Sequence, residues 1–239
     1  MKVSVCMATY NGEKYIKQQL ESILCQLNAD DEVIISDDGS NDETIDVVRR
    51  LNDSRIKIII NDGPRGYTNN FENALKNCNG GIVFLADQDD VWLPGKVNKY
   101  IDMLKSYDFI VGDCRVVDDK LDELSASHFK SCNVKKGFFN NLVFPRYIGA
   151  CMAFNRNVLS IALPFPGHTK YIAHDYWLSL IAELRFNVCV LNEPFMLYRR
   201  HSSNASTGGG RSKNTFPHKM KVRIIACSML IKRVLSGGT

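Results

Sequence analysis

The 239-residue chain contains 45% hydrophobic and 23% charged residues and has a formal net charge of +4. This is an ordinary globular composition, and the length suffices for one large domain or a domain with a sizeable appendage, so we expect a true hydrophobic core. The eight cysteines show neither a CxxC pair nor a metal-ligand spacing. They indicate reduced thiols of a cytoplasmic protein rather than a disulfide framework.

The first part of the chain alternates strand and helix patterns. The opening apolar run in MKVSVCMATYNG is too short for the core of a signal peptide and predicts a first strand. Apolar runs rich in Val and Ile predict buried strands at 3–9, 32–38, 56–62 and 81–88. Helical spacing predicts helices at 12–27, 40–51 and 69–78, with Asn11 capping the first and a Ser40/Glu43 capping box opening the second. This alternation predicts an α/β fold with a parallel sheet and helices on both faces.

The pattern loosens beyond residue 96. We expect a helix at 96–107, a strand at 108–117, and a less regular half after Asp118. That half contains a strand running into a helix at 147–159 and a helix at 173–186 opened by His174 and Asp175. The composition of 204–214 predicts a loop or linker.

The positive charge is concentrated at the end of the chain. Residues 211–239 carry seven Lys or Arg and no acidic residue, which leaves residues 1–210 with a net charge of −3. The apolar stretch of this tail is interrupted by Arg223 and is shorter than the roughly 17 to 25 residues of a spanning helix. A basic amphipathic helix at 217–235 can lie on an anionic membrane surface, or it can pack against its own domain or a partner subunit.

Three carboxylates follow the fourth predicted strand within four positions: Asp87, Asp89 and Asp90. Carboxylates this close repel one another and resist desolvation, and a shared Mg²⁺ or Mn²⁺ relieves both problems. Such a metal also bridges to phosphate. The alternative is a polar turn after a strand. Neither a GxGxxG motif after the first strand nor a GxxxxGK[ST] loop is present, so phosphate must be bound by groups other than a glycine-rich loop.

A second acidic pair, Asp37 and Asp38, ends the second predicted strand. Asp37 either contributes to a ligand site or caps the following helix. For Asp38 we favour a ligand role, because a carboxylate is a pure acceptor and selects a pyrimidine with an N3–H, uracil or thymine, over cytosine. In open α/β sheets, ligands bind at the carboxyl ends of the strands, where both acidic groups are expected.

Five segments, in order and at familiar separations, resemble the GT-A fold glycosyltransferases of family 2: VSVCMATYNGEKYI, VIISDDGSNDET, FLADQDDVW, HDYW and YRRHSSNAS. The similarity covers roughly residues 1–205. ADQDDVWLPGK and YIGACMAF look most like the rhamnosyltransferase-like branch that builds bacterial surface polysaccharides. The resemblance implies a Rossmann-like, mostly parallel sheet with helices on both faces, plus a C-terminal basic helical extension. It implies a nucleotide-sugar-binding half at 1–118, an acceptor-binding and catalytic half at 119–205, and a linker with a basic amphipathic helix at 206–239.

The resemblance implies how the donor is bound. Thr9, Tyr10 and Asn11 would line the nucleotide pocket, with Tyr10 beside the base. Asp38 would accept from the N3–H of that base, and Asp87 would lie near the ribose or diphosphate. The donor would be a UDP-linked or dTDP-linked sugar, with rhamnose from dTDP-rhamnose or a hexose from a UDP-sugar as the leading candidates.

Metal binding and catalysis are assigned in the same way. Asp89 would be the direct ligand of Mg²⁺ or Mn²⁺, with Asp87 and His201 as further candidate ligands. Arg199 and His201 match a family pattern near the diphosphate, although a salt-bridge arginine and a surface histidine are the simpler interpretations. Asp175 would be the general base of an inverting transfer, or else only a helix N-cap, with His174 in place of the usual acidic neighbour.

These assignments predict a metal-dependent enzyme that acts on a glycan or lipid-linked acceptor in surface polysaccharide synthesis. We expect it in the cytoplasm, either free or peripheral at the inner face of the cell membrane, with no nucleic-acid partner. Two alternatives are a catalytically inactive relative that binds nucleotide-sugar and, from a different class, a receiver-like Mg²⁺-binding signalling module. The second fits poorly, because the acidic pair follows the second strand and the chain is too long for one such domain.

Overall fold

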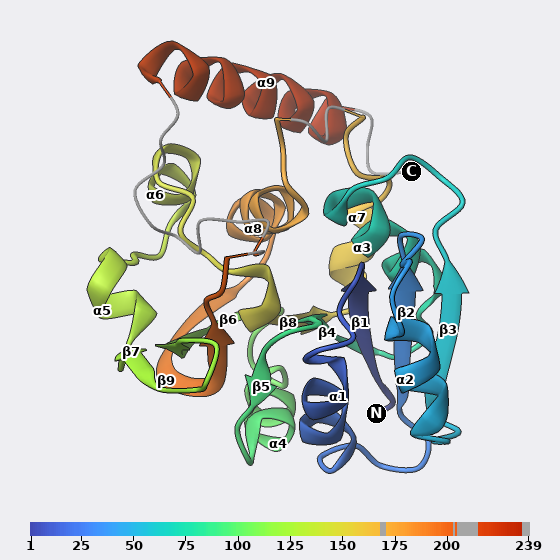
Figure 1. Cartoon of the computed structure of the whole chain (residues 1–239). Helices are drawn as coiled ribbons and strands as arrows, with labels where there is room; N and C mark the ends of the chain where they lie inside the picture. The colour runs from blue at the N-terminus through green and yellow to red at the C-terminus, as the bar shows by residue number, and fades with distance from the viewer. Residues whose placement is uncertain (168–170, 203, 205–214, 236–239) are drawn as a thin grey trace.

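The computed structural model describes residues 1–167, 171–202, 204 and 215–235, and its elements are shown in Figure 1. The strands are β1 (Val3–Thr9), β2 (Glu32–Asp37), β3 (Ile56–Ile60), β4 (Ile82–Asp87), β5 (Val91–Trp92), β6 (Phe109–Val117), β7 (Glu123–Ser125), β8 (Met152–Asn155) and β9 (Val188–Arg199). The helices are α1 (Ile16–Leu24), α2 (Thr44–Arg50), α3 (Tyr67–Asn77), α4 (Lys96–Met103), α5 (His128–Cys132), α6 (Phe138–Val143), the 3-10 helix η1 (Gly149–Cys151), α7 (Asn157–Ala162), α8 (His174–Arg185) and α9 (Phe216–Leu235).

The strands form one sheet in the order β3-β2-β1-β4-β8-β6-β9-β5, with β7 paired to β6. The predicted parallel arrangement is confirmed for β1 to β4, which are joined by helical crossovers. The second half is mixed, because β8 runs antiparallel to β4 and β6 whereas β9 runs parallel to β6.

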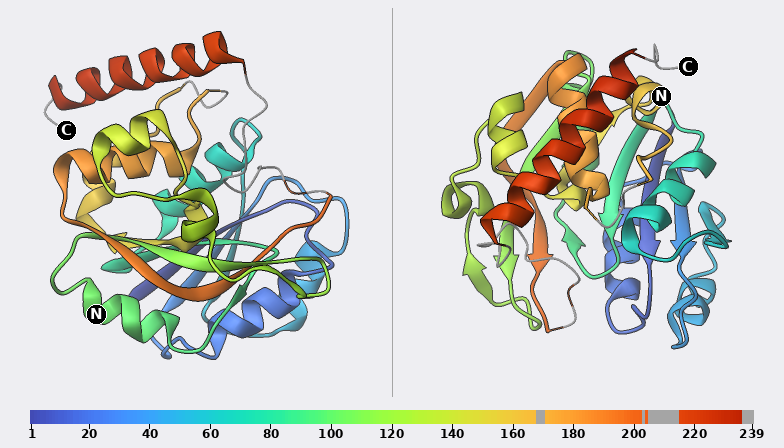
Figure 2. Two further views of the ribbon diagram at one scale, coloured as in Figure 1. Left: turned by 90° about the vertical axis from the view of Figure 1, so that its left-hand side faces the viewer. Right: turned by 90° about the horizontal axis from the view of Figure 1, so that it is seen from above.

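Helices cover both faces of the sheet, as predicted, and each face has its own core (Figure 2). On one face α1, α2 and α4 bury residues such as Leu20, Val48 and Tyr100 against the strands. On the other face α3, α7 and α8 bury large side chains that include Phe71 and Trp177. The full burial of β1, β2 and β4 explains why their sequences read as continuous apolar runs.

Both predicted helix caps are wrong. α1 begins at Ile16 without a side-chain cap, because Asn11 adopts a left-handed conformation (φ 48°) and its side chain accepts from the backbone of Asn41 instead. α2 begins at Thr44, and the Ser40 hydroxyl donates to Asp37 rather than capping the helix. Both side chains are used in the tight packing of the loops that follow β1 and β2.

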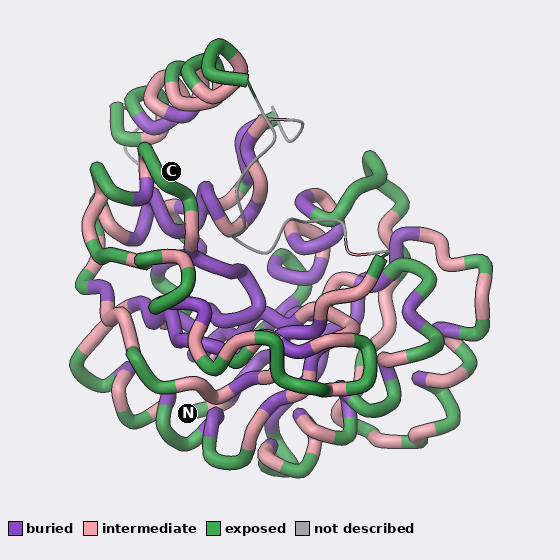
Figure 3. Tube along the Cα trace, turned by 60° about the vertical axis from the view of Figure 1, so that its left-hand side comes forward, coloured by how far each residue is buried: buried purple, intermediate pink, exposed green. Residues whose placement is uncertain are grey.

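α9 lies across α6 and α8 at the outside of the molecule (Figures 1 and 3). Its inner face buries Ala226 and Leu230, and Arg223 donates to the Val143 carbonyl at 2.8 Å. Among the described residues, no helix combines the length and hydropathy that a membrane crossing requires. Apart from Asn204, the linker expected at 204–214 falls outside the described residues. The eight cysteines are all described and are free thiols, with Cys25 exposed rather than in the core.

Candidate active site

The polar ends of three neighbouring strands meet at one edge of the sheet. In the parallel register, Thr9 of β1 pairs with Asp37 of β2, and Ala8 pairs with Asp87 of β4. This confirms the juxtaposition expected from the strand pattern. Open parallel sheets bind ligands at this edge, so the edge is the candidate active site.

Asp87, Asp89 and Asp90 form a compact acidic cluster after β4, with carboxylate oxygens within 4.8 Å of one another. Asp90 is fully buried, and its Oδ1 accepts the backbone N–H of Arg199 at 3.0 Å. Its Oδ2 has no hydrogen-bond partner among the described residues. Burial, together with Asp89 and Asp87, raises the pKa of Asp90. A donorless buried oxygen beside two further carboxylates fits a hard divalent cation such as Mg²⁺ or Mn²⁺.

Lys96 is a fully buried cation close to this cluster, which sequence analysis did not select. Its Nζ donates to the Ala150 carbonyl at 3.1 Å and lies 4.1 Å from the centroid of the Trp92 ring. Burial lowers the pKa of Lys96 to about 8. Burial, Asp89 and Asp175 raise the pKa of Asp87 to about 8, and the positive charge of Lys96 opposes that rise. Lys96 therefore supplies part of the positive charge that the buried acids require, and Trp92 is a packing residue.

Asp89 is held by side chains from the segment that follows β9. Its Oδ2 is 2.7 Å from Nε2 of His201 and accepts from Nδ2 of Asn204 at 3.0 Å. The His201 ring stacks on Tyr15 of the loop before α1, with 4.8 Å between centroids. The structure thus brings two of the three predicted metal candidates, Asp89 and His201, into direct contact. Asn204 and Tyr15 were not predicted from the sequence.

Arg199 is 3% exposed, and its guanidinium is used by the protein itself. Nε donates to the Asp89 carbonyl at 2.7 Å, and Nη1 donates to the Asp119 carbonyl at 2.8 Å. Nη2 donates to Oε1 of Gln18 at 2.7 Å. The side chain also covers the ring of Tyr15. Arg199 therefore fixes the backbone of the acidic loop relative to α1.

Asp38 lies at the end of β2 and is 8% exposed. Its Oδ1 accepts from Nδ2 of Asn61 at 2.7 Å, and its Oδ2 accepts from the backbone of Gly66 at 2.8 Å. Asp37 next to it accepts from Thr9 Oγ1 at 2.9 Å and from the backbone of Ser40 at 2.8 Å. Asp37 and the Thr9 hydroxyl are therefore occupied in building the loop, whereas each oxygen of Asp38 retains a second lone pair.

Tyr10 and Asn11 form the rim on the β1 side. Tyr10 is 47% exposed, and its backbone N–H and C=O both pair with the side-chain amide of Gln88, at 2.9 and 3.0 Å. The Asn11 backbone donates to Ser40 Oγ at 2.9 Å. Gln88, the middle residue of the DQD sequence, thus ties the loop after β1 to the acidic loop. No role for Gln88 was predicted from the sequence.

Asp175 lies in the first turn of α8, beside His174. The His174 ring stacks on Phe71 with 4.0 Å between centroids, and neither ring nitrogen has a hydrogen-bond partner among the described residues. Burial lowers the pKa of His174, against the opposing effect of Asp175. His174 is therefore a neutral packing side chain. Asp175 accepts only a local hydrogen bond, from the Tyr176 backbone at 2.7 Å, and stays half-buried at the site.

Tyr67, the first residue of α3, is a further side chain at this edge. Burial raises the pKa of Tyr67, and the negative charges of Asp175 and Asp87 add to the rise. The Tyr67 hydroxyl thus shares one electrostatic environment with the candidate base and the acidic cluster. Its position after β3, just before the predicted helix at 69–78, was the available signal, and sequence analysis did not use it.

This site belongs to a class of enzymes that bind a phosphorylated donor at the ends of parallel strands. The model of the glycosyl transferase family 2 matches residues 4–161, and the chain belongs to this family. Its fold is GT-A, and the protein is a glycosyltransferase.

The chain is similar to relatives whose names state an activity. The chain is 27% identical over 215 residues to the UDP-Glc:alpha-D-GlcNAc-diphosphoundecaprenol beta-1,3-glucosyltransferase WfgD of Escherichia coli, covering 88% of this chain and 81% of the relative. It is 28% identical to the dTDP-rhamnosyl transferase RfbG of Shigella flexneri, covering 83% of this chain and 72% of the relative.

Two solved structures show the same fold. TarS 1–349 of S. aureus in complex with UDP-GlcNAc aligns with a TM-score of 0.72 at 20% identity, covering 95% of this chain and 66% of that one. Glucosyl-3-phosphoglycerate synthase of Mycobacterium tuberculosis, in complex with Mn²⁺, UDP and glucosyl-3-phosphoglycerate, aligns with a TM-score of 0.62 at 16% identity, covering 97% and 79%.

Proposed function

We propose that this glycosyltransferase transfers a sugar, with inversion, from a UDP-linked or dTDP-linked donor onto a hydroxyl of a lipid-linked or oligosaccharide acceptor in surface polysaccharide synthesis. The observation that carries the proposal is the compact cluster of Asp87, Asp89 and Asp90 at the carboxyl ends of the parallel strands, with carboxylate oxygens within 4.8 Å of one another. Burial and Asp89 raise the pKa of Asp87, and Asp175, 88 residues away in sequence, adds to that rise, which supports a candidate base close to the cluster.

Asp175 would take the proton from the acceptor hydroxyl as its oxygen attacks the anomeric carbon of the donor. The bond from that carbon to the diphosphate oxygen then breaks, and the diphosphate leaves with the electron pair. Mg²⁺ or Mn²⁺ held by Asp87 and Asp89, with His201 as a further candidate ligand, would offset the negative charge of the diphosphate. Arg199 supports this role through the contacts that fix the Asp89 backbone.

On the nucleotide side, Tyr10 would lie beside the base, with Thr9 and Asn11 shaping the pocket. A free lone pair of Asp38 would accept from the pyrimidine N3–H. The relatives act with UDP-Glc and dTDP-rhamnose according to their names, which supports a uracil or thymine donor and keeps rhamnose and glucose as the leading sugars. The division at 118 and 205 into donor and acceptor parts is part of the same proposal.

The deciding experiment is calorimetric titration with UDP, dTDP, CDP and GDP, each with Mn²⁺ and with EDTA. We expect UDP or dTDP to bind only with metal and CDP to bind at least tenfold more weakly. The Asp38→Asn variant should lose this discrimination. If no nucleotide binds under either condition, the proposal is wrong. If UDP binds but no acceptor is ever glycosylated, the protein is the inactive relative instead.

We also propose that the outer face of α9 rests on an anionic membrane surface. That face carries a stripe of exposed apolar residues at helical spacing: Phe216, Met220, Ile224, Ile231 and Leu235. The exposed cations Lys221 and Lys232 flank the stripe, and α9 contains no acidic residue. The inner face of α9 packs on the protein, as the packing alternative expects. In this proposal the inner face anchors the helix to its own domain and the outer face binds the membrane surface.

A further inference from the structure

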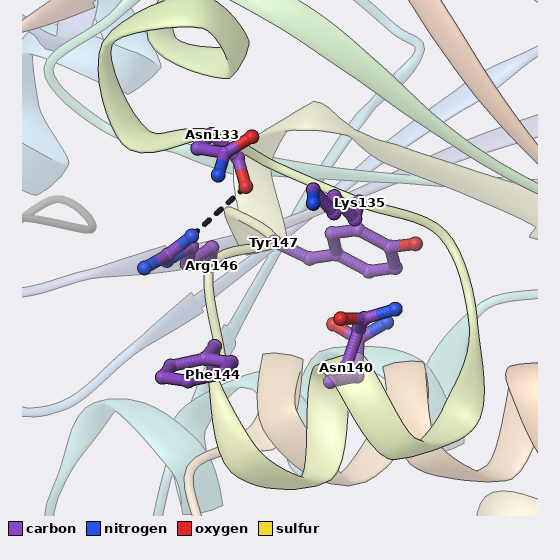
Figure 4. Close-up of a pocket in the computed structure, with 7 residues that line it drawn as sticks. Asn133, Lys135, Asn140, Phe144, Arg146 and Tyr147 are labelled. Atoms are coloured by element: carbon purple, nitrogen blue, oxygen red, sulfur yellow. Dashed lines mark hydrogen bonds between the residues drawn. The ribbon is translucent and has the colours of Figure 1, made fainter.

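A hollow of about 150 Å³ lies between α5, α6 and the segment that leads to η1 (Figure 4). Its lining residues are Asn133, Lys135, Asn140, Asn141, Phe144, Arg146 and Tyr147. The volume is below the roughly 300 to 1,000 Å³ of sites for drug-sized ligands, so the hollow suits one small group rather than a whole nucleotide-sugar. None of the roles assigned above uses these residues.

The lining has a marked positive character. It contains two cations, Lys135 and Arg146, and no carboxylate. Arg146 donates through Nη1 to the Asn133 carbonyl at 2.8 Å, and its guanidinium lies over the Phe144 ring. Its Nε and Nη2 donors, and the Lys135 ammonium, have no hydrogen-bond partner among the described residues. Arginine and lysine donors together with side-chain amides form the usual surroundings of a bound phosphate.

The structure around the hollow is well fixed. Nε2 of His128, a buried side chain, is 2.9 Å from the backbone carbonyl of Arg146. The Tyr147 hydroxyl donates to Glu183 of α8 at 2.7 Å, and the backbone of Gly137 donates to the same carboxylate at 3.0 Å. Glu183 is thus held in place by protein donors and is not itself one of the residues that line the hollow.

One residue that lines the hollow lies near the active site. Tyr147 is two residues before Gly149, so their Cα atoms are at most about 7 Å apart. A Cβ built on Gly149 would be 3.3 Å from the Cβ of Asp175. The Cα of Tyr147 therefore lies within roughly 12 Å of the Cβ of the candidate base, a separation that a short glycan spans.

The other side leads to α9. Residues of α6 and the turn after it, Phe139, Val143 and Phe144, are exposed by 78%, 48% and 53%. The Val143 carbonyl accepts from Arg223 of α9, and Figure 2 shows α6 directly beneath α9. An apolar rim thus continues from the hollow toward the exposed stripe of α9.

We propose that this hollow binds the diphosphate of a lipid-linked acceptor, which rests on the function proposed above. In such an acceptor the diphosphate joins the glycan to the lipid chain. The hollow occupies the corresponding place, between the candidate base on one side and an apolar surface on the other. Lys135 and Arg146 bind the diphosphate, so the enzyme recognises the carrier as well as the terminal sugar.

The test measures binding of geranyl diphosphate, inorganic pyrophosphate and inorganic phosphate by calorimetry, in EDTA and without donor. Under these conditions the donor site, which requires a metal ion, does not contribute to the measured binding. We expect geranyl diphosphate to bind most tightly. The double variant Lys135→Gln/Arg146→Gln should weaken this binding by roughly tenfold or more, because it removes both cations. Lys130→Gln, a neighbouring lysine outside the hollow, and Asp89→Asn, at the acidic cluster, should bind like the wild type.

Three results would overturn the proposal: no binding of geranyl diphosphate to the wild type, equal binding to the double variant, or loss of binding in Asp89→Asn. Equal affinity for inorganic phosphate and geranyl diphosphate would also overturn it, in favour of a free-phosphate site. Arg146→Lys, which keeps the charge, separates recognition from misfolding and should bind between the wild type and the double variant. Failure of the donor titration with UDP or dTDP would reject the proposed function alone, because no nucleotide enters this test.

Discussion

The imidazole of His174 lies flat on the ring of Phe71, with 4.0 Å between the ring centroids, immediately before the candidate base Asp175. In the family that the segment HDYW resembles, an acidic residue usually occupies the position of His174. Here the side chain is neutral, buried and without polar partners among the described residues. The residue before the candidate base is therefore held by ring packing, where a second carboxylate would need polar partners.

This arrangement predicts a stability change with pH. Because burial lowers the pKa of His174 in the folded state, the unfolded chain binds more protons below its own pKa of about 6.5. The free energy of unfolding should therefore fall as the pH drops below about 6.5, by up to about 1.4 kcal/mol per pH unit. His174→Phe should remove this contribution between pH 7.5 and 5.5 in urea titrations. His218→Phe, on α9, is the control and should keep the wild-type dependence of the unfolding free energy on pH. The same dependence in His174→Phe would show that His174 does not cause the effect.

Replacing the candidate base should separate chemistry from binding. Asp175→Asn keeps the size of the side chain but cannot take up the acceptor proton. We expect kcat to fall by about 10²- to 10⁴-fold while the dissociation constant of the nucleotide stays the same. Asp102→Asn, an exposed residue of α4, should behave like the wild type. Turnover that survives in Asp175→Asn would assign the base elsewhere, with Tyr67 as the next residue to replace.

Glu32 predicts a second pH effect, in a lower window. Burial alone would raise the pKa of Glu32, but hydrogen bonds from Lys57, Ser4, the Asn79 backbone and Lys2 lower it to about 2. The ionised Glu32 therefore adds about 3 kcal/mol to the free energy of unfolding. This stabilisation is complete above a pH of about 4.5 and is lost as the pH falls toward 2. Glu32→Gln should destabilise the protein by a similar amount at pH 7.

The control for Glu32 is Glu21→Gln, which breaks an exposed pair with Lys17 at 3.8 Å. Such a pair contributes little, so its loss should change the free energy of unfolding by less than about 0.5 kcal/mol. Equal effects of the two substitutions in urea titrations at pH 7 would mean that the Glu32 contacts do not stabilise the fold.

The outer face of α9 gives a binding prediction. The full chain should sediment with vesicles that contain phosphatidylglycerol, and less with neutral vesicles. Lys221→Glu/Lys232→Glu should weaken this binding by roughly tenfold or more, since each cation contributes about 1 kcal/mol near an anionic surface. Lys120→Glu/Lys130→Glu makes the same charge change on other parts of the surface and should have a smaller effect. Equal losses would indicate net charge rather than α9 as the cause.

The strands and helices of the first half were predictable because they follow simple periodicity. β1 appears at the residues that its apolar run indicated, and α3, α4 and α8 lie within two residues of the expected starts. β9 was missed, although it is twelve residues long, because its sequence alternates poorly and contains Pro194. Short elements such as β7 and α5 depend on tertiary contacts and leave little trace in a local pattern.

The acidic cluster was predictable for a different reason. Three carboxylates after a buried strand are a local signal, and strand topology alone brings them to the right edge. The contacts of Asp89 with His201 and Asn204 join residues more than 110 positions apart, and no local pattern reports such a pairing. The contacts of Arg199 could not be predicted from a local pattern either. Its charge suggested a ligand role, whereas its guanidinium donates to Asp119 and Gln18, which are distant in sequence.

The contacts of Arg199 also bear on how the enzyme is made. A nascent chain that has emerged only through β8 already contains β1 to β4 and all three carboxylates, but it lacks the donor for Asp90 and the side chain that joins Gln18 to the acidic loop. N-terminal segments usually fold first during synthesis. The candidate catalytic edge can therefore be completed only after β9 has been synthesised and has paired with β6, and translation products that end before Arg199 should lack turnover.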